Sequence, residues 1–393
     1  SEVKMNREPF RFEERLKYLQ EYGSHCMSFS TLQPNLSYFD VPRKGYLAYK
    51  QYAGTRIVLS DPITAPEHYT DIIEGILHAH PNTCFVQVHE PIARILNSRF
   101  GFFVNAFGVE YFLQRDLFTR KGSSNIHKRS HELIEALEDH SLREYLRGNH
   151  MEFVRRQLTA ALKGGIKIAE QEPNRWDIEK LRKLSVEWLQ TRRVAGIETV
   201  FLTRPLTLHT DQKLGVRLFV ASALNSDILG FAVLDPMFRD GQVVGYFCDL
   251  VRVRSDAPRG TATALKIFPM SKIFQEGYHF FHLGLSPFSK VGPVFYNDGA
   301  GRLEIYTEPR KDLSVERVDR KFVTSLFRMN FKKGDFLYGA RSLAFHKERF
   351  RFQEEPVFYC SKSKIPLAEI VKGFLLSGIN PIRQLALILC RRG

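Results

Sequence analysis

Two charged residues, Asp249 and Arg252, interrupt an apolar run that extends from residue 243 to residue 253. The run is rich in β-branched and aromatic residues, which is typical of a buried strand. Burying both charges is costly unless they pair or bind a ligand. Here a carboxylate can bind an ammonium group or accept a proton, and a guanidinium can hold an ester carbonyl or a phosphate. The simpler alternative is a structural Asp–Arg pair. Residues three apart in a strand point to opposite faces, so we expect a β-bulge to re-aim one of them.

The residues that follow predict the elements that position this pair. A turn over 255–260 precedes a helix over 261–275, and Gly277 ends that helix. A second apolar run, 279–285, predicts another strand. Strand, turn, helix and strand make a βαβ unit, whose strands are parallel and buried. The turn opens a helix N-terminus, where free N–H groups attract an anion.

The same stretch resembles a known protein family. It contains, in order, Asp249-Leu250-Val251-Arg252, Asp256-Ala257-Pro258, Gly260 and His282-Leu283-Gly284-Leu285-Ser286-Pro287. This order resembles the D-L-M-R, D-A-P-N-G and N-L-G-M-A-P-L-S pattern of the soluble synthase domain of lysyl- or aminoacyl-phosphatidylglycerol synthases, the multiple peptide resistance factors. The resemblance implies two domains of the GNAT acyltransferase fold side by side, and transfer of an amino acid from aminoacyl-tRNA to a lipid hydroxyl. It makes Asp249 and Arg252 catalytic candidates. The candidates for substrate binding in this stretch are Asp256, Gly260, Gly284 and Ser286.

A second match lies near the C-terminal end. Residues 342–350 and 355–358 resemble the family's G-L-R-x-F-K-x-K-F-x-P-x-W-E-P-x-Y. Lys347 falls on the first lysine of that pattern and is the third catalytic candidate, as a phosphate or oxyanion contact. Arg349 replaces the second lysine, which keeps the charge but changes the donor geometry. Arg349 and Glu355 are further substrate-binding candidates. Glu354 replaces the family's Trp and Phe352 its Pro, so this wall of the acceptor site is altered.

Other departures bear on the substrates. Ala262-Thr263 stands where the family has M-D, so a carboxylate that could help to recognise a cationic amino acid is missing, and lysine as the transferred residue is in doubt. His282 replaces the family's Asn. The acetyl-CoA signature R/Q-x-x-G-x-G/A fits at Gly260 and Ala262 but fails at its first position, Ala257.

Composition points to an anionic partner. The chain has 393 residues, enough for about two domains, and 57 basic against 43 acidic residues give a net charge of +14. Such a charge favours nucleic acid, an anionic membrane or a phosphorylated substrate, with simple solubility as the alternative. Two basic pairs, Lys128-Arg129 and Arg155-Arg156, are candidate tRNA contacts; the alternative is a solvated linker helix.

The five cysteines are widely spaced and form no CxxC pair, so we expect neither a metal site nor a disulfide framework, and a reducing cytoplasm fits best. We find no signal peptide and no apolar run of about 18 residues that would span a membrane.

The expected fold class is α/β with mixed sheets, arranged as two GNAT-like domains in tandem. We expect residues 1–165 to form the first domain, with a basic insertion near 119–149, and residues 166–361 to form the catalytic domain. Residues 362–393 form an apolar and basic tail, which predicts either a packed helical hairpin or an anchor on the membrane surface. Outside the βαβ unit, we expect helices over 7–22, 66–80, 177–193 and 319–330, a hairpin of apolar runs over 45–50 and 56–62, and strands over 84–88, 216–223 and 228–234.

Three functional hypotheses remain. The first is an aminoacyltransferase that uses charged tRNA as co-substrate, needs no cofactor, and acts on phosphatidylglycerol, another lipid or a soluble hydroxyl or amine acceptor. The second is an N-acyltransferase that uses acyl-CoA or an acyl carrier protein on the same fold. The third is a non-catalytic scaffold that binds an anionic membrane or RNA. For the first, we expect a cytoplasmic protein with peripheral contact to the inner face of the membrane.

Overall fold

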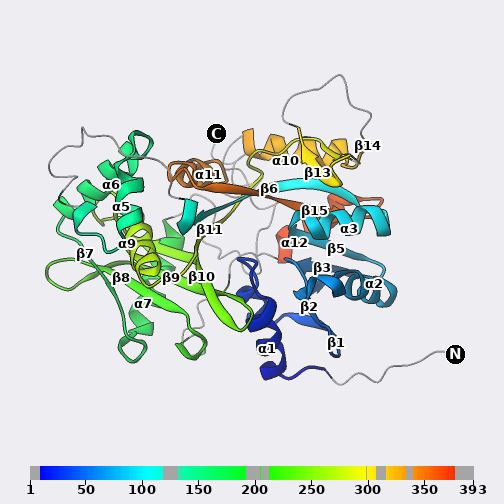
Figure 1. Cartoon of the computed structure of the whole chain (residues 1–393), viewed down its shortest axis with the longest axis horizontal. Coiled ribbons are helices and arrows are strands. Elements are labelled where there is room, and N and C mark those ends of the chain that lie inside the picture. Colours follow the sequence, from blue (N-terminus) through cyan, green and yellow to red (C-terminus); the bar gives the residue numbers. More distant parts are fainter. Residues whose placement is uncertain are drawn as a thin grey trace.

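A single sheet of twelve strands runs across the molecule (Figure 1). The structure is a computed structural model, and it describes residues 9–117, 132, 134–191, 204, 212–297, 299–306, 316–332 and 340–376. The helices of this part of the chain are α1 (Phe12–Tyr22), α2 (Tyr69–Ala79), α3 (Glu90–Phe100), α5 (His140–Arg147), α6 (Glu152–Lys163), α7 (Ile178–Gln190), α9 (Thr261–Gln275), α10 (Lys321–Lys332), α11 (Ala340–Glu348) and α12 (Pro366–Leu376).

The strands follow in the same chain order. The large sheet contains β1 (Ser37–Val41), β2 (Gly45–Tyr52), β3 (Thr55–Leu59), β4 (Ile63–Thr64), β5 (Thr83–Val88), β6 (Phe103–Gln114), β7 (Lys167–Glu170), β8 (Arg217–Ser222), β9 (Ile228–Arg239), β10 (Gln242–Val253), β11 (Phe280–Pro287) and β15 (Gln353–Ser361). A small sheet contains β12 (Val294–Asn297), β13 (Arg302–Ile305) and β14 (Glu316–Arg317).

The same topology occurs twice. In the first unit β1, β2 and β3 are antiparallel, and α2 then connects β3 to β5, its parallel neighbour. In the second unit β8, β9 and β10 are antiparallel, and α9 connects β10 to its parallel neighbour β11. The expected βαβ unit and the expected class, a mixed α/β fold of two GNAT-like units in tandem, are both confirmed.

The two units exchange their last strands at the centre of the sheet, where the order is β5-β15-β6-β11. Strand β6 follows the first unit in the chain but pairs with β11 of the second unit. Strand β15 follows the second unit but pairs with β5 of the first. Residues 353–361, which the sequence places in the second domain, therefore lie between two strands of the first segment, and the domain boundaries stay a prediction.

The expected bulge in β10 is present, at Asp249. The pairing of β10 with β9 shifts register between Cys248 and Leu250. In a regular strand, residues two positions apart point to the same face. Here Cys248 packs in the core beneath α9, whereas Leu250 packs in the core beneath α7. The alternation rule for a regular strand does not apply across Asp249.

Strands β10 and β11 pair over only a short distance. Their register covers three residue pairs, from Gly245–Phe280 to Phe247–His282. Beyond this point β10 pairs only with β9, and β11 only with β6. A second bulge, next to Gly284, starts the divergence: Gly284 has a φ of +68°, and a Cβ there would come within 2.5 Å of the Phe247 ring. The fold therefore requires a glycine at position 284. The role of Gly284 in substrate binding stays a prediction.

Most local elements agree with their predictions within a few residues. The predicted helices 7–22, 66–80, 177–193 and 319–330 correspond to α1, α2, α7 and α10, and α9 has the predicted bounds. The hairpin of β2 and β3 turns at Ala53 and Gly54, both of which have positive φ.

The first part of the tail is packed. Helix α12 places Ile370 and Phe374 against the core of the first unit, and the buried Glu369 accepts hydrogen bonds from Tyr359 and Ser361 on β15. Residues 377–393 lie outside the described part. Within the described residues, we find no helix both long enough and apolar enough to cross a bilayer.

Candidate functional site

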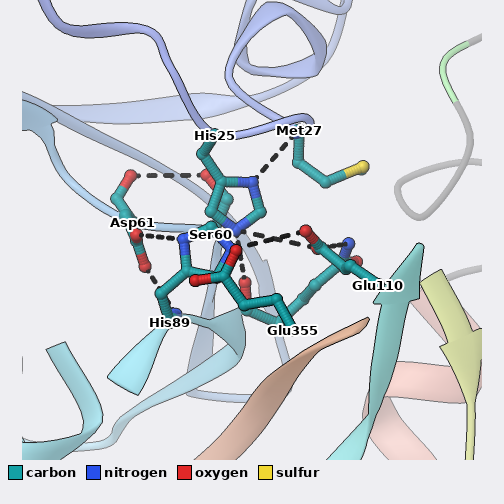
Figure 2. A network of polar contacts seen from close by, with 8 residues as sticks. His25, Met27, Ser60, Asp61, His89, Glu110 and Glu355 are labelled. Carbon is teal, nitrogen blue, oxygen red and sulfur yellow. Dashed lines mark hydrogen bonds and ion pairs between the residues drawn. The ribbon is translucent and has the colours of Figure 1, made fainter. Parts of the chain in front are cut away.

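The first unit brings an aspartate and a histidine together at one edge of the sheet. Asp61 follows the end of β3, and His89 follows the end of β5. Because the carboxyl ends of parallel strands meet at the same edge, the two side chains come into contact. The backbone N–H of His89 donates to Asp61 Oδ1 at 2.9 Å, and its Nδ1 lies 3.0 Å from Asp61 Oδ2 (Figure 2).

His89 also reaches two glutamates on the exchanged strands. Glu110 on β6 lies directly opposite Glu355 on β15, an arrangement that is repulsive for two carboxylates. His89 Nε2 lies 3.3 Å from Glu110 Oε2 and 3.8 Å from Glu355 Oε2, so the imidazole stands between them. Glu110 is completely buried, and its Oε1 accepts a hydrogen bond of 2.7 Å from Gln87 Nε2.

The protonation states of the two histidines follow from these contacts. His25 Nδ1 accepts from the backbone N–H of Met27 at 3.0 Å, so Nε2 carries the proton and donates to Gln87 O at 3.0 Å. The His25 ring stacks on His89 with centroids 4.0 Å apart. Burial and the charge of His89 lower the pKa of His25, which is therefore neutral.

His89 and its carboxylate partners are charged. Burial by itself lowers the pKa of His89, but Asp61 and Glu110 outweigh this effect and raise it well above 6.5. Burial by itself raises the pKa of Glu110, but the imidazoles of His25 and His89 outweigh it and hold that pKa below its ordinary value. The site thus contains one imidazolium between ionised carboxylates.

Two groups of side chains have the composition of a metal site. The ligand-type atoms of His25, Asp61 and His89 lie within 4.8 Å of one another, as do those of His25, Cys26 and Glu110. All four ring nitrogens of His25 and His89 already face a protein donor or acceptor. Protons are sufficient to explain this arrangement, and the expectation of no metal stays a prediction.

Lys347 enters the same site from the other unit. It lies on α11, is almost completely buried, and donates from Nζ to the carbonyl of Leu285 at 2.8 Å. Leu285 is the β11 residue directly opposite Glu110, so the row Glu355, Glu110 and Leu285 crosses three adjacent strands. Burial and the charge of Lys266 lower the pKa of Lys347 to about 7, against the opposing effects of Cys26 and Glu110.

The other two catalytic candidates lie on β10. Asp249 is half-buried at the bulge, and Arg252 is buried. The guanidinium of Arg252 lies 3.9 Å from the centre of the Trp188 ring, and its Nε lies 3.4 Å from Ser185 Oγ, both on α7. Trp188 thus holds this arginine in place through a cation–π contact.

The turn before α9 is closely covered. Gly260 has a φ of +91°, and a Cβ there would lie 2.0 Å from the carbonyl oxygen of Gln157 on α6. The N–H groups of Thr261 and Thr263 already donate to the carbonyls of Pro258 and Gly260. The predicted anion site at this helix N-terminus is therefore occupied in large part by the chain itself.

The remaining substrate-binding candidates are dispersed. Asp256 is exposed and pairs with Arg254 at 2.6 Å. Arg349 lies 4.3 Å from the Phe153 ring centre and 4.1 Å from that of Phe345. Ser286 is fully buried on β11, and its hydroxyl has no hydrogen-bond partner among the described residues. Glu355, by contrast, lies next to His89, with 3.8 Å between its Oε2 and His89 Nε2. The substrate roles of all these candidates stay predictions.

The candidate tRNA contacts differ in exposure. Arg155 is buried, and its Nη1 donates to the carbonyls of Leu146 and Gly148 at the end of α5, which gives this arginine a structural role. Arg156 is exposed, with Glu152 at 3.7 Å. Lys128 and Arg129 lie outside the described residues.

The first unit's contribution to the site was not predicted from the sequence. The signals were present: Asp61 and His89 each follow a predicted strand and precede Pro62 or Glu90-Pro91, and Glu110 interrupts an apolar run. His282, noted as a departure from the family, also lies here; burial, together with the charges of His89 and Lys347, lowers its pKa to about 3, so it is neutral.

Known proteins share sequence and fold with this chain. The sequence model described as "Phosphatidylglycerol lysyltransferase, C-terminal" matches residues 16–133 and 135–361. The chain belongs to this family. It is similar to phosphatidylglycerol lysyltransferase of Bacillus subtilis strain 168, with 26% identity over 285 residues, which make up 71% of this chain and 29% of that protein. The chain therefore corresponds to less than a third of the length of this relative.

Two solved structures have the same fold. L-PGS from Bacillus licheniformis superposes with a TM-score of 0.66 at 18% identity, covering 92% of this chain and 96% of that one. The C-terminal domain of a putative lysylphosphatidylglycerol synthetase from Agrobacterium fabrum gives a TM-score of 0.66 at 16% identity, covering 93% and 98%. The family and the fold inferred from the sequence motifs are thus confirmed.

We predict that His89→Gln destabilises the protein in a pH-dependent way. The substitution leaves the buried Glu110 and the half-buried Asp61 without their cation, which costs about 3 kcal/mol or more. Because the pKa of His89 is raised on folding, its contribution is fully present below about pH 6.5 and is lost as pH rises through the folded value. Urea unfolding of wild type and variant should therefore differ most near pH 6 and less near pH 9. The exposed His78→Gln is the control, and a difference independent of pH would contradict the charged state of His89.

Proposed function

We propose that this protein transfers an amino acid from aminoacyl-tRNA to a hydroxyl or amine acceptor, with phosphatidylglycerol as the acceptor that family membership favours. The observation that carries the proposal is that Lys347 on α11 and Glu110 on β6 lie in one buried site, where β11 diverges from β10. Lys347, which the family motif indicates, thus lies close to a charged group of the first unit, Glu110.

The chemistry requires little covalent assistance from the protein. An amino acid ester on a ribose is already activated, so the protein has to orient the acceptor, accept its proton and stabilise the oxyanion. A bond forms between the acceptor oxygen or nitrogen and the ester carbonyl carbon, and the bond from that carbon to the ribose oxygen breaks. The acceptor's proton passes to a base and finally to the ribose oxygen, so that atoms and charges balance.

We assign roles by charge. Asp249 binds the α-ammonium of the transferred amino acid. Arg252, fixed on Trp188, holds the ester carbonyl or a phosphate. Lys347 has a pKa of about 7, so at neutral pH its neutral amine is available to take the proton from the acceptor hydroxyl or amine. No cofactor is needed for this sequence of steps.

Two observations weigh on the alternative functions. Acyl-CoA would place its pyrophosphate at the turn before α9, and there the backbone of α6 at Gln157 approaches Gly260 too closely for even a Cβ to fit. A non-catalytic scaffold would have no use for a buried lysine close to a buried glutamate and two thiols, an arrangement that costs stability. The transferase hypothesis therefore has the strongest support. We retain the expectation of a cytoplasmic protein with peripheral membrane contact as part of it.

Replacing either charged residue of β10 should abolish transfer. Asp249→Ala and Arg252→Ala each remove a contact made in the transition state, for which losses of about a hundredfold or more are usual. The measurement is release of the labelled amino acid from tRNA into the acceptor, with circular dichroism as the check on folding. Glu179→Ala and Arg182→Ala, on the exposed side of α7, are the matched controls. Wild-type turnover in a folded Asp249 or Arg252 variant would remove that residue from the site.

The rate should depend on pH through Lys347. If its neutral amine is the base, kcat/KM rises between about pH 6 and pH 8, and Lys347→Arg, which stays charged, loses this rise. Lys266→Gln removes a positive charge that lowers the pKa of Lys347, so the rise should move to higher pH. A profile that falls over the same range, or one that Lys266→Gln leaves in place, would show that Lys347 acts as a cation instead.

The donor is distinguished by salt and by nuclease. Each phosphate that the protein neutralises releases counterions, so transfer from charged tRNA should weaken by orders of magnitude between about 50 and 200 mM salt. RNase should abolish the activity in extract. Activity that survives RNase, requires added acyl-CoA and changes little with salt would establish the acyl-CoA alternative.

A further inference from the structure

Helix α10 exposes a ridge of large apolar side chains. Its buried side, formed by Val323, Thr324 and Phe327, packs on the first unit. Phe322 and Met329 point away from this core and are 58% and 45% exposed. They are seven residues apart, so they lie two turns apart on the same side of the helix. Together with the half-buried Leu326 between them, they form an apolar strip along the helix.

The strip lies among cations. Lys321, Arg328 and Lys332 are exposed on the same helix, and no residue of α10 is acidic. By helical geometry, the three cations lie together along one side of the Phe322–Met329 strip. An exposed apolar strip bordered by basic residues is the pattern of helices that lie in the interface of an anionic bilayer.

The pattern continues next to the helix. Arg320 lies 4.1 Å from the ring centre of Phe103, which is 43% exposed at the start of β6. Lys362 follows Ser361, the β15 residue paired with Phe103. Of the acidic residues just before α10, Asp319 is buried and bonded to Arg317 and Thr324, whereas Glu316 is exposed.

The surface is connected to the site by α11. This helix contacts α10, and the two run along the same edge of the molecule (Figure 1). Its Lys347 points into the protein, whereas Phe345 is 55% exposed and Arg341 is exposed. The helix that supplies a catalytic candidate thus presents an aromatic and a cationic side chain to the solvent.

We propose that α10, together with Phe103, Arg320 and Lys362, docks on an anionic lipid bilayer, with Phe322 and Met329 inserted among the headgroups. The inference adds a binding surface to the proposed transfer and rests on that function only for its biological purpose. RNA also attracts cations, but Met329 and Phe322 form an aliphatic and aromatic ridge rather than a stacking platform, so a bilayer fits better. The surface is distinct from the tail, whose α12 packs against the first unit.

The first test measures sedimentation with vesicles of phosphatidylcholine alone and with added phosphatidylglycerol. Phe322→Ser with Met329→Ser should lower binding to the anionic vesicles about tenfold. The control is Val186→Ser with Leu224→Ser, which removes two exposed apolar residues elsewhere. Arg328→Gln with Lys332→Gln should also lower binding and reduce its dependence on salt, and its control is Lys17→Gln with Lys183→Gln. Unchanged binding in the α10 variants, or equal binding to neutral vesicles, would overturn the proposal.

The second test reports insertion directly. Phe322→Trp should show a blue shift of its fluorescence with anionic vesicles, and brominated lipid should quench it, whereas Val186→Trp should respond to neither. A Trp at position 322 that responds to tRNA and not to vesicles would assign the surface to RNA instead. Transfer to a detergent-dispersed acceptor should stay unchanged in the α10 double variant. If wild-type protein showed no transfer, the proposed function would fail while the vesicle results would still decide the docking surface.

Discussion

The antiparallel pairing of β6 with β15 is the constraint on which the rest of the structure depends. Each of these strands belongs by sequence to one unit and by pairing to the other, and their register runs from Gln353–Phe112 to Ser361–Phe103. Separating the units would break this ladder and both flanking ladders, with β5 and with β11. The exchange also sets the row Glu355, Glu110 and Leu285 across three strands. The catalytic candidates of the second unit are thereby fixed relative to the charged groups of the first.

The electrostatics of the site follow from that register. Placing Glu110 opposite Glu355 brings two carboxylates together, and Asp61 adds a third nearby. His89 lies between them and compensates for the repulsion by taking a proton. This charge in turn keeps the stacked His25 neutral, which suits the bonds that His25 makes to Met27 and Gln87. Glu110 is ionised because of these contacts, and its carboxylate is an anionic neighbour of the Lys347 ammonium.

The sequence predicts the local features well because they depend on short-range patterns. Helix α9, the parallel strands on either side of it and the bulge at Asp249 follow from apolar runs, turn residues and two charges in a buried strand. The resemblance also located Lys347. It did not place β15 between β5 and β6, because that pairing joins residues more than 200 positions apart in the chain. For the same reason the partners of Glu110 were not foreseen. Arg155 is a second example. The Arg155-Arg156 pair predicts a nucleic-acid contact, but nothing in the sequence reveals that the Arg155 guanidinium caps the end of α5.

The repeated topology explains why the two units contribute differently to one site. In the first unit the parallel strands stay paired to their ends: Leu59 pairs with Val86, and the N–H of Ser60 still donates to Val86 O. Asp61 and His89 then close this edge by bonding to each other. In the second unit the parallel strands part after three pairs, and the carbonyl of Leu285, beyond the point of divergence, accepts from Lys347 instead. The closed edge holds charges in fixed positions, whereas at the other edge β10 and β11 stop pairing with each other after Phe247 and His282. In the proposed transfer, the first unit thus supplies charged groups next to the catalytic candidates of the second.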